Sequence, residues 1–391
     1  MPTNNIIPIT QYKSETHNNY LDKDIKNIIY PFHIFLALLF SSKYRIKGNY
    51  ILPIDNKCFF IRLLCVCYVI GVTGHRIWHK DIESFIYSGD VYIVKFISLF
   101  LPVTRCLAFV VDVIINFIYR HCSILLILII QRIHRTIDIS EDISSLITCN
   151  WIITLTVLCI DIFVFVTIGT ATRFFNLMNC FSEILLINFD VDFVYTIQIL
   201  VLLIKCLEGW VRHVDMVNVG EDEKLYYEKL FVTYQHILIA FDLYKKVSHV
   251  LIFYRTMNAL CRSLSSFEFT MQFVKTVKLS NEQIQVSKLL TNLMLVLGIV
   301  KDVLQFILHC VYCEKFYTAV EEAETACIKQ TMNENCSYSQ GRLCMNVLRQ
   351  NRSSFIKMSA CGLFHVDAML LLSVMGLLTN YAFVLLQFAF L

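Results

Sequence analysis

Long apolar blocks recur along this chain and constrain its fold more than any other feature. Seven of them occupy 59–78, 96–119, 146–170, 182–206, 248–272, 289–311 and 363–390. A hydrocarbon layer about 30 Å thick selects blocks of about 20 residues, because an α-helix rises about 1.5 Å per residue. A soluble all-helical protein does not need so many. The pattern predicts an all-α, polytopic membrane protein with seven transmembrane helices.

Composition supports a membrane protein and indicates no cofactor. The chain is 57% hydrophobic, only 17% charged and has a mean hydropathy of +0.60, whereas about a quarter of a soluble domain is charged. The net charge of +3 does not indicate nucleic-acid binding. Most of the sixteen cysteines lie within apolar runs and read as small core side chains. The isolated Cys310-x-x-Cys313 has no second pair, so we expect neither a metal nor a cofactor.

Several shorter stretches are expected not to cross the membrane. Residues 29–40 are too few and contain Pro31, which predicts a short N-terminal re-entrant or interfacial helix, or one packed beneath the bundle. Apolar residues 123–130 run into a polar segment and fit a helix that continues into the cytosol. Residues 224–246 and 311–330 are amphipathic. We expect these extensions of the second, fourth and sixth spans to form a cytosolic anchor bundle.

The N-terminus is expected in the cytosol, because no removable signal peptide follows the polar segment 1–28. Seven spans then place the C-terminus outside a plasma membrane, although Lys and Arg density does not decide the orientation. The expected regions are a cytosolic N-terminus (1–58), a ligand-binding bundle (59–311), a cytosolic helical loop (312–360) and a seventh helix (361–391). The sequons at Asn335 and Asn351 are then cytosolic and unused, whereas an external N-terminus would expose both.

The last span carries two amides on one side. Residues about seven apart share a helix face, so Asn380 and Gln387 lie on one stripe with Phe383, Val384 and Leu391. Amides are unfavourable toward lipid, so the stripe should face protein or water. If several copies met around an axis, Gln387 would form a ring of amides with an apolar constriction beside it. In the alternative, Gln387 hydrogen-bonds a neighbouring helix and lines no pore.

A family motif ends the same span. Insect gustatory receptors end in Thr-Tyr, five hydrophobic residues and Gln-Phe; here the chain has Asn380-Tyr381, AFVLL and Gln387-Phe388. Asn380 replaces the threonine, and Thr379 stands one position early. The approach through residues 362–367 is also similar. The chain therefore resembles the insect gustatory receptor family over 361–391, and its architecture is similar over nearly the whole length.

This resemblance implies a nonselective cation channel of taste neurons, gated by a small-molecule tastant. It implies a homo-tetramer, or a hetero-tetramer with other gustatory receptors, in which each last helix lines the pore. The implied pore and gate residues are Asn380, Phe383, Val384, Gln387, Phe388 and Leu391. Bitter or aversive compounds are the expected ligands because such members are numerous in the family. A sugar-sensing receptor and an insect odorant receptor-type channel remain alternatives.

The resemblance also implies a ligand pocket in the outer half of each subunit. Polar residues inside spans usually face a cavity or a partner. The candidates for this pocket are Arg105, Asp161, Asp190, Tyr195, Ser266, Glu268 and Asn292. In the alternative, several of them form structural ion pairs or lie at the headgroup level. Lys301 and Asp302 are deeper and adjacent, and we expect them to form an internal brace.

Other classes of protein fit the sequence less well. A G-protein-coupled receptor usually has an acidic-Arg-Tyr end on its third span and prolines in its sixth and seventh, whereas Pro102 is the only proline within these spans. A secondary transporter often shows internal repeats and helices broken by glycine or proline, and no repeat is visible here. The chain has no phosphate loop, His-Glu-x-x-His or nucleophile elbow, so an enzyme is not expected.

Overall fold

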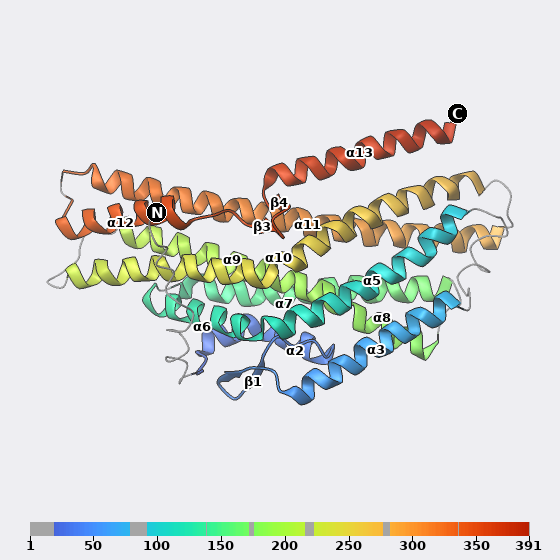
Figure 1. The fold of residues 1–391 in the computed structure, drawn as a ribbon, viewed down its shortest axis with the longest axis horizontal. Coiled ribbons are helices and arrows are strands. Elements are labelled where there is room, and N and C mark those ends of the chain that lie inside the picture. Colours follow the sequence, from blue (N-terminus) through green and yellow to red (C-terminus); the bar gives the residue numbers. More distant parts are fainter. Residues whose placement is uncertain are drawn as a thin grey trace.

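The computed structural model describes residues 19–78, 92–137, 139–171, 176–215, 223–276, 282–334 and 336–390. Within these ranges, the chain is an elongated bundle of roughly parallel and antiparallel helices (Figure 1). Two small antiparallel β-hairpins interrupt it. The expected all-α, polytopic architecture is therefore confirmed.

The first half of the bundle begins with a short helix and a hairpin. Its elements are α2 (Lys23–Leu38), β1 (Arg45–Lys47), β2 (Tyr50–Leu52), α3 (Asn56–Trp78), α5 (Tyr92–Ile118), α6 (Arg120–Thr136) and α7 (Ser140–Ala171). The second half contains the longest helices. Its elements are α8 (Leu177–Leu186), α9 (Asn188–Asp215), α10 (Glu223–Thr276), α11 (Glu282–Thr331), α12 (Tyr338–Ser354), β3 (Ser359–Ala360), β4 (Phe364–His365) and α13 (Ala368–Phe390).

Each of the seven expected spans coincides with a helix or a pair of helices. Among the described residues, four helical stretches are long and apolar enough to cross a membrane, and α5 with α6 makes a fifth if the bent pair is one span. α10 is outside this group because Arg255 and Arg262 lower its hydropathy. The described apolar part of α13, Ala368–Val384, is shorter. Crossing by α10 and α13 stays a prediction.

Two of the expected helical extensions are built differently. The second span does not continue straight into residues 123–130, because the chain bends by 67° between α5 and α6. Residues 224–246 extend α10, the fifth span, whereas the fourth span has its own extension to Asp215. The pattern of an amphipathic segment does not show which neighbouring span it continues. The expectation that residues 224–246 extend the fourth span was therefore wrong. Residues 311–330 continue the sixth span within α11, as expected.

The core of the bundle is organised around α9. Nearly all of its side chains from Asn188 to Leu207 are buried, including those on opposite faces. Helices α5, α6, α7, α10 and α11 all contact it. α2 also packs on α7 and α9 through a buried face that includes Ile25, Phe32 and Leu36. The short N-terminal helix is thus part of the folded bundle, with only its outer side exposed.

Two buried hydrogen bonds join α9, α10 and α12 at the end of the bundle where α12 lies (Figure 1). The Trp210 Nε1 donates a hydrogen bond to the Leu230 carbonyl at 2.9 Å. Tyr234 on α10 donates its hydroxyl to Asn351 Oδ1 on α12 at 2.6 Å, and both side chains are buried. Asn351, one of the two sequon asparagines, therefore lies inside a helix interface. Asn335 lies outside the described residues.

The last helix, α13, diverges from the rest of the bundle (Figure 1). The hairpin of β3 and β4 precedes it and turns through Cys361 and Gly362, both with positive φ. Gly362, at φ +76°, is suited to this turn because glycine has no Cβ to clash there. Val366 N donates to the Met358 carbonyl, closing the hairpin. The hairpin thus sets where α13 leaves the bundle.

We expect Tyr234→Phe to destabilise the end of the bundle where α10 contacts α12. The change leaves Asn351 Oδ1 buried without its donor, which costs about 1–3 kcal/mol. Thermal unfolding of the purified protein in detergent, followed by fluorescence-detected size exclusion, measures the loss. Tyr338→Phe is the matched control, because Tyr338 is 86% exposed. Equal unfolding temperatures for the two variants would contradict the role of this bond.

Candidate ligand site and pore helix

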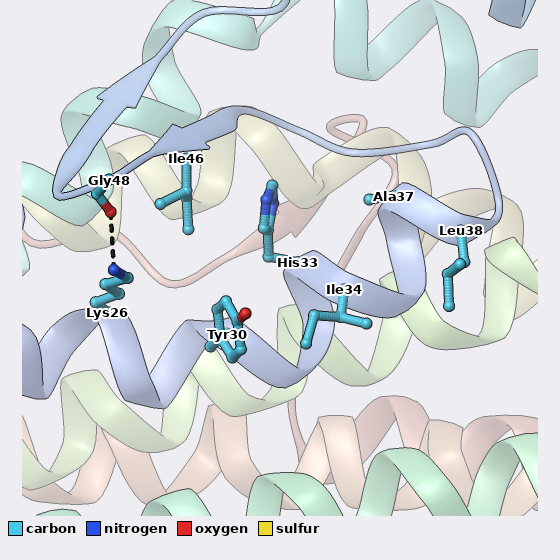
Figure 2. Close-up of a pocket in the computed structure, with 8 residues that line it drawn as sticks. All are labelled: Lys26, Tyr30, His33, Ile34, Ala37, Leu38, Ile46 and Gly48. Atoms are coloured by element: carbon cyan, nitrogen blue, oxygen red, sulfur yellow. Dashed lines mark hydrogen bonds between the residues drawn. The ribbon is translucent and has the colours of Figure 1, made fainter.

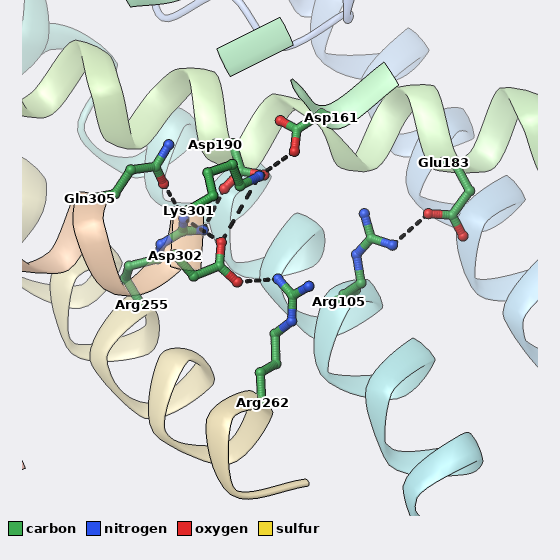
Figure 3. A network of polar contacts seen from close by, with 9 residues as sticks. All are labelled: Arg105, Asp161, Glu183, Asp190, Arg255, Arg262, Lys301, Asp302 and Gln305. Atoms are coloured by element: carbon green, nitrogen blue, oxygen red, sulfur yellow. Dashed lines mark hydrogen bonds and ion pairs between the residues drawn. The ribbon is translucent and has the colours of Figure 1, made fainter. Parts of the chain in front are cut away.

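Six charged side chains meet inside the bundle and form an ion-pair network (Figure 3). The cations are Arg255 and Arg262 of α10 and Lys301 of α11; the carboxylates are Asp161 of α7, Asp190 of α9 and Asp302 of α11. The charges therefore balance. Four helices contribute to one cluster at the same level of the bundle, which allows charges to be buried that would be unfavourable singly.

Arg255 is the centre of this network. Its Nη1 lies 2.6 Å from an Asp190 oxygen and its Nη2 lies 2.9 Å from Asp302 Oδ1. Nη2 also donates to Gln305 Oε1. The guanidinium lies over two aromatic rings of α9, 5.3 Å from the Phe189 centroid and 5.1 Å from the Phe193 centroid. Arg255 is only 1% exposed, so these contacts replace nearly all of its hydration.

Lys301 joins the remaining carboxylate, Asp161, to Asp190. Its Nζ donates to Asp190 Oδ2 at 2.7 Å and to Asp161 Oδ1. Asp302, the next residue, pairs with Arg255 and with Arg262, and its Oδ1 lies 3.9 Å from Lys301 Nζ. Adjacent helical residues point about 100° apart, so Lys301 and Asp302 reach opposite charges on different helices. The expectation that they brace the interior agrees with these contacts.

Arg105 and Glu183 form a separate ion pair beside the network (Figure 3). Arg105 Nη1 of α5 lies 2.5 Å from Glu183 Oε2 of α8. The Arg105 side chain is 36% exposed, in contrast to Arg255. This pair therefore joins α5 to α8 at a more accessible position.

A second polar cluster lies on the other side of α9. Lys43, which follows α2, lies 2.7 Å from Asp192 Oδ1 and donates to Asn116 of α5. Asp112 of α5 accepts hydrogen bonds from Asn116 and from Asn188. Residues two apart on a helix point in nearly opposite directions, so Asp190 and Asp192 enter different clusters. The two clusters hold α9 between α5 on one side and α10 and α11 on the other.

The expected pocket residues do not all come together. Asp161 and Asp190 share Lys301, and Arg105 pairs with Glu183 nearby. Tyr195 lies elsewhere, with its ring 5.5 Å from that of Phe32 on α2 and 5.3 Å from Lys43 Nζ. Its position five residues after Asp190 turns it toward the second cluster. The side chains of Ser266, Glu268 and Asn292 lie outside the described part of the structure.

Sequence reasoning missed four members of this region. They are Glu183, Arg255, Arg262 and Gln305. A signal for two of them was present, because Arg255 and Arg262 are cations inside an expected span, seven residues and about two helical turns apart. Both reach Asp302 from one side of α10. Equal numbers of intramembrane cations and carboxylates would have indicated pairing.

The polar stripe of α13 is exposed in the single chain. Phe383 is 61% and Val384 46% exposed, and Asn380 and Gln387 are also exposed. Ser373, seven residues before Asn380, extends the stripe toward the start of the helix and is exposed as well. Tyr381 is half-buried. The side chain of Phe388, and residue Leu391, are outside the described residues.

The opposite side of α13 packs on the bundle. Leu371 and Leu378 point about 180° away from Asn380 on the helix and line a narrow closed gap against α10 and α11. Phe306 of α11 lines the same gap, as does Ser263 of α10. The Ser263 hydroxyl is buried and has no hydrogen-bond partner among the described residues. Because the side of α13 that carries Leu371 and Leu378 packs on α10 and α11, the polar stripe faces outward.

Two solved structures with this fold are of the insect olfactory receptor OR5 from Machilis hrabei, the second in complex with eugenol. In each comparison the TM-score is 0.67 and the identity 11%, and the match covers 94% of this chain and 100% of the receptor chain. No family model and no curated protein matches the sequence. The likeness shows that this chain has the fold of an insect olfactory receptor. The insect chemoreceptor architecture expected from the C-terminal motif is therefore confirmed.

The two classes of ion pair predict different effects of mutation. Arg255→Met leaves Asp190 and Asp302 with buried, partly uncompensated charge and should cost about 3–5 kcal/mol of stability. Arg105→Met removes a partner that is more than one-third exposed, and should cost about 0–1 kcal/mol. Thermal unfolding in detergent compares the variants. A similar loss for both would contradict the central role of Arg255.

Proposed function

We propose that this chain is a ligand-gated cation channel subunit of the insect chemoreceptor superfamily, with gustatory specificity. The fold likeness supports a chemoreceptor, and the Tyr381…Gln387-Phe388 spacing supports the gustatory branch. The proposed regions are the N-terminal part (1–58), the ligand-binding bundle (59–311), the cytosolic loop (312–360) and the pore helix (361–391).

One observation carries the channel proposal: α13 leaves the bundle with its amide-bearing side exposed. Asn380 and Gln387 would be unfavourable against lipid, so the stripe needs an aqueous or protein neighbour. Four copies arranged around an axis provide one, with Gln387 amides facing the water-filled path and Phe383 and Val384 narrowing it. The proposed assembly is a homo-tetramer, or a hetero-tetramer with related receptors.

The proposed ligand is a small organic molecule bound above the ion-pair network. In this proposal Asp161 and Asp190, which share Lys301, would form the floor of the site together with nearby Arg105 (Figure 3). Asp161 Oδ2 is buried without a hydrogen-bond partner among the described residues. Such a floor orients a ligand that carries one or two polar groups. Bitter or aversive tastants fit a mostly apolar pocket of this kind better than sugars do.

An odorant receptor-type channel is the second candidate. It is favoured by the likeness to an olfactory receptor whose structure was solved with eugenol. Calcium imaging of expressing cells with a panel of volatile aromatics, bitter compounds and sugars separates the two. Responses confined to volatile compounds would assign the olfactory function and reject the gustatory one.

For the pore, we expect Gln387→Ala to change cation permeation or gating while surface expression remains normal. The exposed amide makes no packing contribution in the single chain, so its loss should act through the pore. Whole-cell recording with monovalent and divalent cations measures relative permeability. An at least twofold change is expected, because one lost hydrogen bond to a permeating ion or its water contributes about 0.5–1.5 kcal/mol.

Thr379→Ala is the matched control for this test. Thr379 is also polar and exposed on α13, but it points about 80–100° away from Asn380 and Gln387, and its hydroxyl already donates to the Met375 carbonyl at 2.8 Å. Currents should then match those of the unmodified channel. Unchanged currents in Gln387→Ala would remove Gln387 from the pore.

The proposed orientation, with a cytosolic N-terminus, predicts no glycan at Asn335 or Asn351. Enzymatic deglycosylation should therefore leave the gel mobility of the expressed protein unchanged. Ile86→Asn creates an Asn-Tyr-Ser sequon in the segment after the first span, which this orientation places outside. That variant should shift on deglycosylation. The reverse pattern would invert the topology.

A further inference from the structure

An open groove lies between α2 and the first hairpin (Figure 2). Its volume is about 550 Å³, and its lining residues are Lys26, Tyr30, His33, Ile34, Ala37, Leu38, Ile46 and Gly48. Neither the pore helix nor the ion-pair network contributes to it. The groove therefore requires a separate explanation.

The groove is polar at one end and apolar at the other. Figure 2 shows Lys26 and Gly48 at one end of α2 and Leu38 at the opposite end. Lys26 Nζ donates to the Gly48 carbonyl at 2.8 Å and to Asn49 Oδ1 at 3.1 Å, both neutral acceptors. Lys26 has no carboxylate within ion-pair distance among the described residues. Its positive charge is thus available to a ligand.

Apolar side chains at the other end remain exposed. Leu38 is 67% exposed, and Phe40, just beyond α2, is 42% exposed. Tyr50, on the hairpin beside the Lys26 end, is also 51% exposed. Exposed aliphatic and aromatic side chains beside cations are typical of segments that lie at a membrane surface. Polarity falls along the groove from the Lys26 ammonium to Leu38, as it falls along a lipid from the headgroup to the acyl chain.

Chain connectivity places the groove near the membrane boundary. β2 ends at Leu52, and the candidate span Asn56–His75 begins four residues later. The first turns of that span already expose Phe60 and Leu64. The hairpin that forms one wall of the groove therefore lies where the chain enters the hydrocarbon.

Most of the uncompensated charges around the groove, among the residues that the structure describes, are positive. Lys23, Lys47 and Lys57 are exposed and make no ion pair among the described residues. Burial lowers the pKa of His33, so its ring is neutral at pH 7 and adds no charge. Lys26 is then the single cation that lines the groove.

The carboxylates near the groove each have a basic neighbour. Arg135 contacts Asp22 at 2.7 Å and lowers the pKa of that carboxyl. Asp55 lies 2.6 Å from Arg45. Asp24, whose side chain is 53% exposed, does not line the groove and lies 3.8 Å from His134 Nε2. No carboxylate is among the lining residues, so an anion at Lys26 would have no carboxylate beside it within the groove.

We propose that this groove binds an anionic phospholipid, with its phosphate at Lys26 and its acyl chain along Ala37 and Leu38. In the orientation proposed above, the site faces the cytoplasmic leaflet, where anionic lipids are concentrated. The bound lipid would fix α2 at the surface. Because α2 packs on α7 and α9, the site connects membrane composition to the helices that carry Asp161 and Asp190.

The test uses the full chain in nanodiscs made of phosphatidylcholine with a minor fraction of phosphatidylserine. The protein is then released from the nanodiscs, and native mass spectrometry identifies the lipids that stay bound to it. The unmodified protein should retain phosphatidylserine in preference to phosphatidylcholine. Lys26→Gln removes the charge but keeps a donor for Gly48 and Asn49. Its retention of phosphatidylserine should be about fivefold weaker, because this is the usual effect of one lysine at an anionic surface.

Two further variants separate the groove from its surroundings. Ala37→Trp fills the groove without touching Lys26 and should abolish preferential retention while the unfolding temperature is kept. Lys57→Gln removes an exposed charge at the start of the first span, outside the groove, and retention should not change. An equal loss in Lys57→Gln and Lys26→Gln would show diffuse surface attraction and overturn the site.

Other occupants give other results, and each would overturn the proposal. One such result is that inorganic phosphate in detergent displaces phosphatidylserine as effectively as a soluble phosphoserine headgroup does, while the protein shows no preference among lipids. That result would indicate a site for free anions. Break-up of the oligomer by Ala37→Trp, with lipid retention unchanged, would assign the groove to a contact between subunits. Neither result bears on the pore, because currents through Gln387 variants are measured separately.

Discussion

Buried charge is the constraint on which this structure depends. Three cations and three carboxylates lie within helices that are otherwise apolar, and each must find a partner because a single buried charge costs several kcal/mol. Arg255 pairs with two carboxylates at once and lies over two aromatic rings. Since the partners come from α7, α9, α10 and α11, sliding any one of these helices by a turn would separate charges. The network therefore fixes the relative register of the bundle, which apolar packing alone specifies only weakly.

The same constraint explains why α9 is the central helix. Asp190 faces the network, and Asp192, two residues later, faces Lys43 and the second cluster. A helix with polar anchors on opposite sides must be surrounded by protein on both. Nearly all of its side chains are buried as a result. α2 and the first hairpin become part of the fold for this reason, because Lys43 follows directly after α2.

The spans were readable from sequence because hydropathy is a property of one short, continuous segment. The all-α architecture follows from it, as does the amide-bearing stripe of α13, since helical periodicity is also local. Partners were not readable. Lys301 meets Asp161 across 140 residues, and no local pattern distinguishes an ion pair from a ligand contact. Tyr195 was grouped with Asp190 because both are polar and close in sequence, whereas helical rotation sends them to different clusters. The bend between α5 and α6 was missed because no proline marks it.

Helix α11 links the candidate ligand site to α13, the proposed pore helix. It carries Lys301 and Asp302 in the network, and four turns later Tyr317, whose hydroxyl donates to the Val366 carbonyl and accepts from Met358 N. Those two residues close the hairpin from which α13 departs. A ligand that altered the pairing of Lys301 would therefore act on the same rigid helix that holds the base of α13. Phe306, between these positions, packs in the gap beneath Leu371 and Leu378. A movement of α11 would thus reach α13 both through its base and through its packed side, while the polar stripe stays free to line a pore.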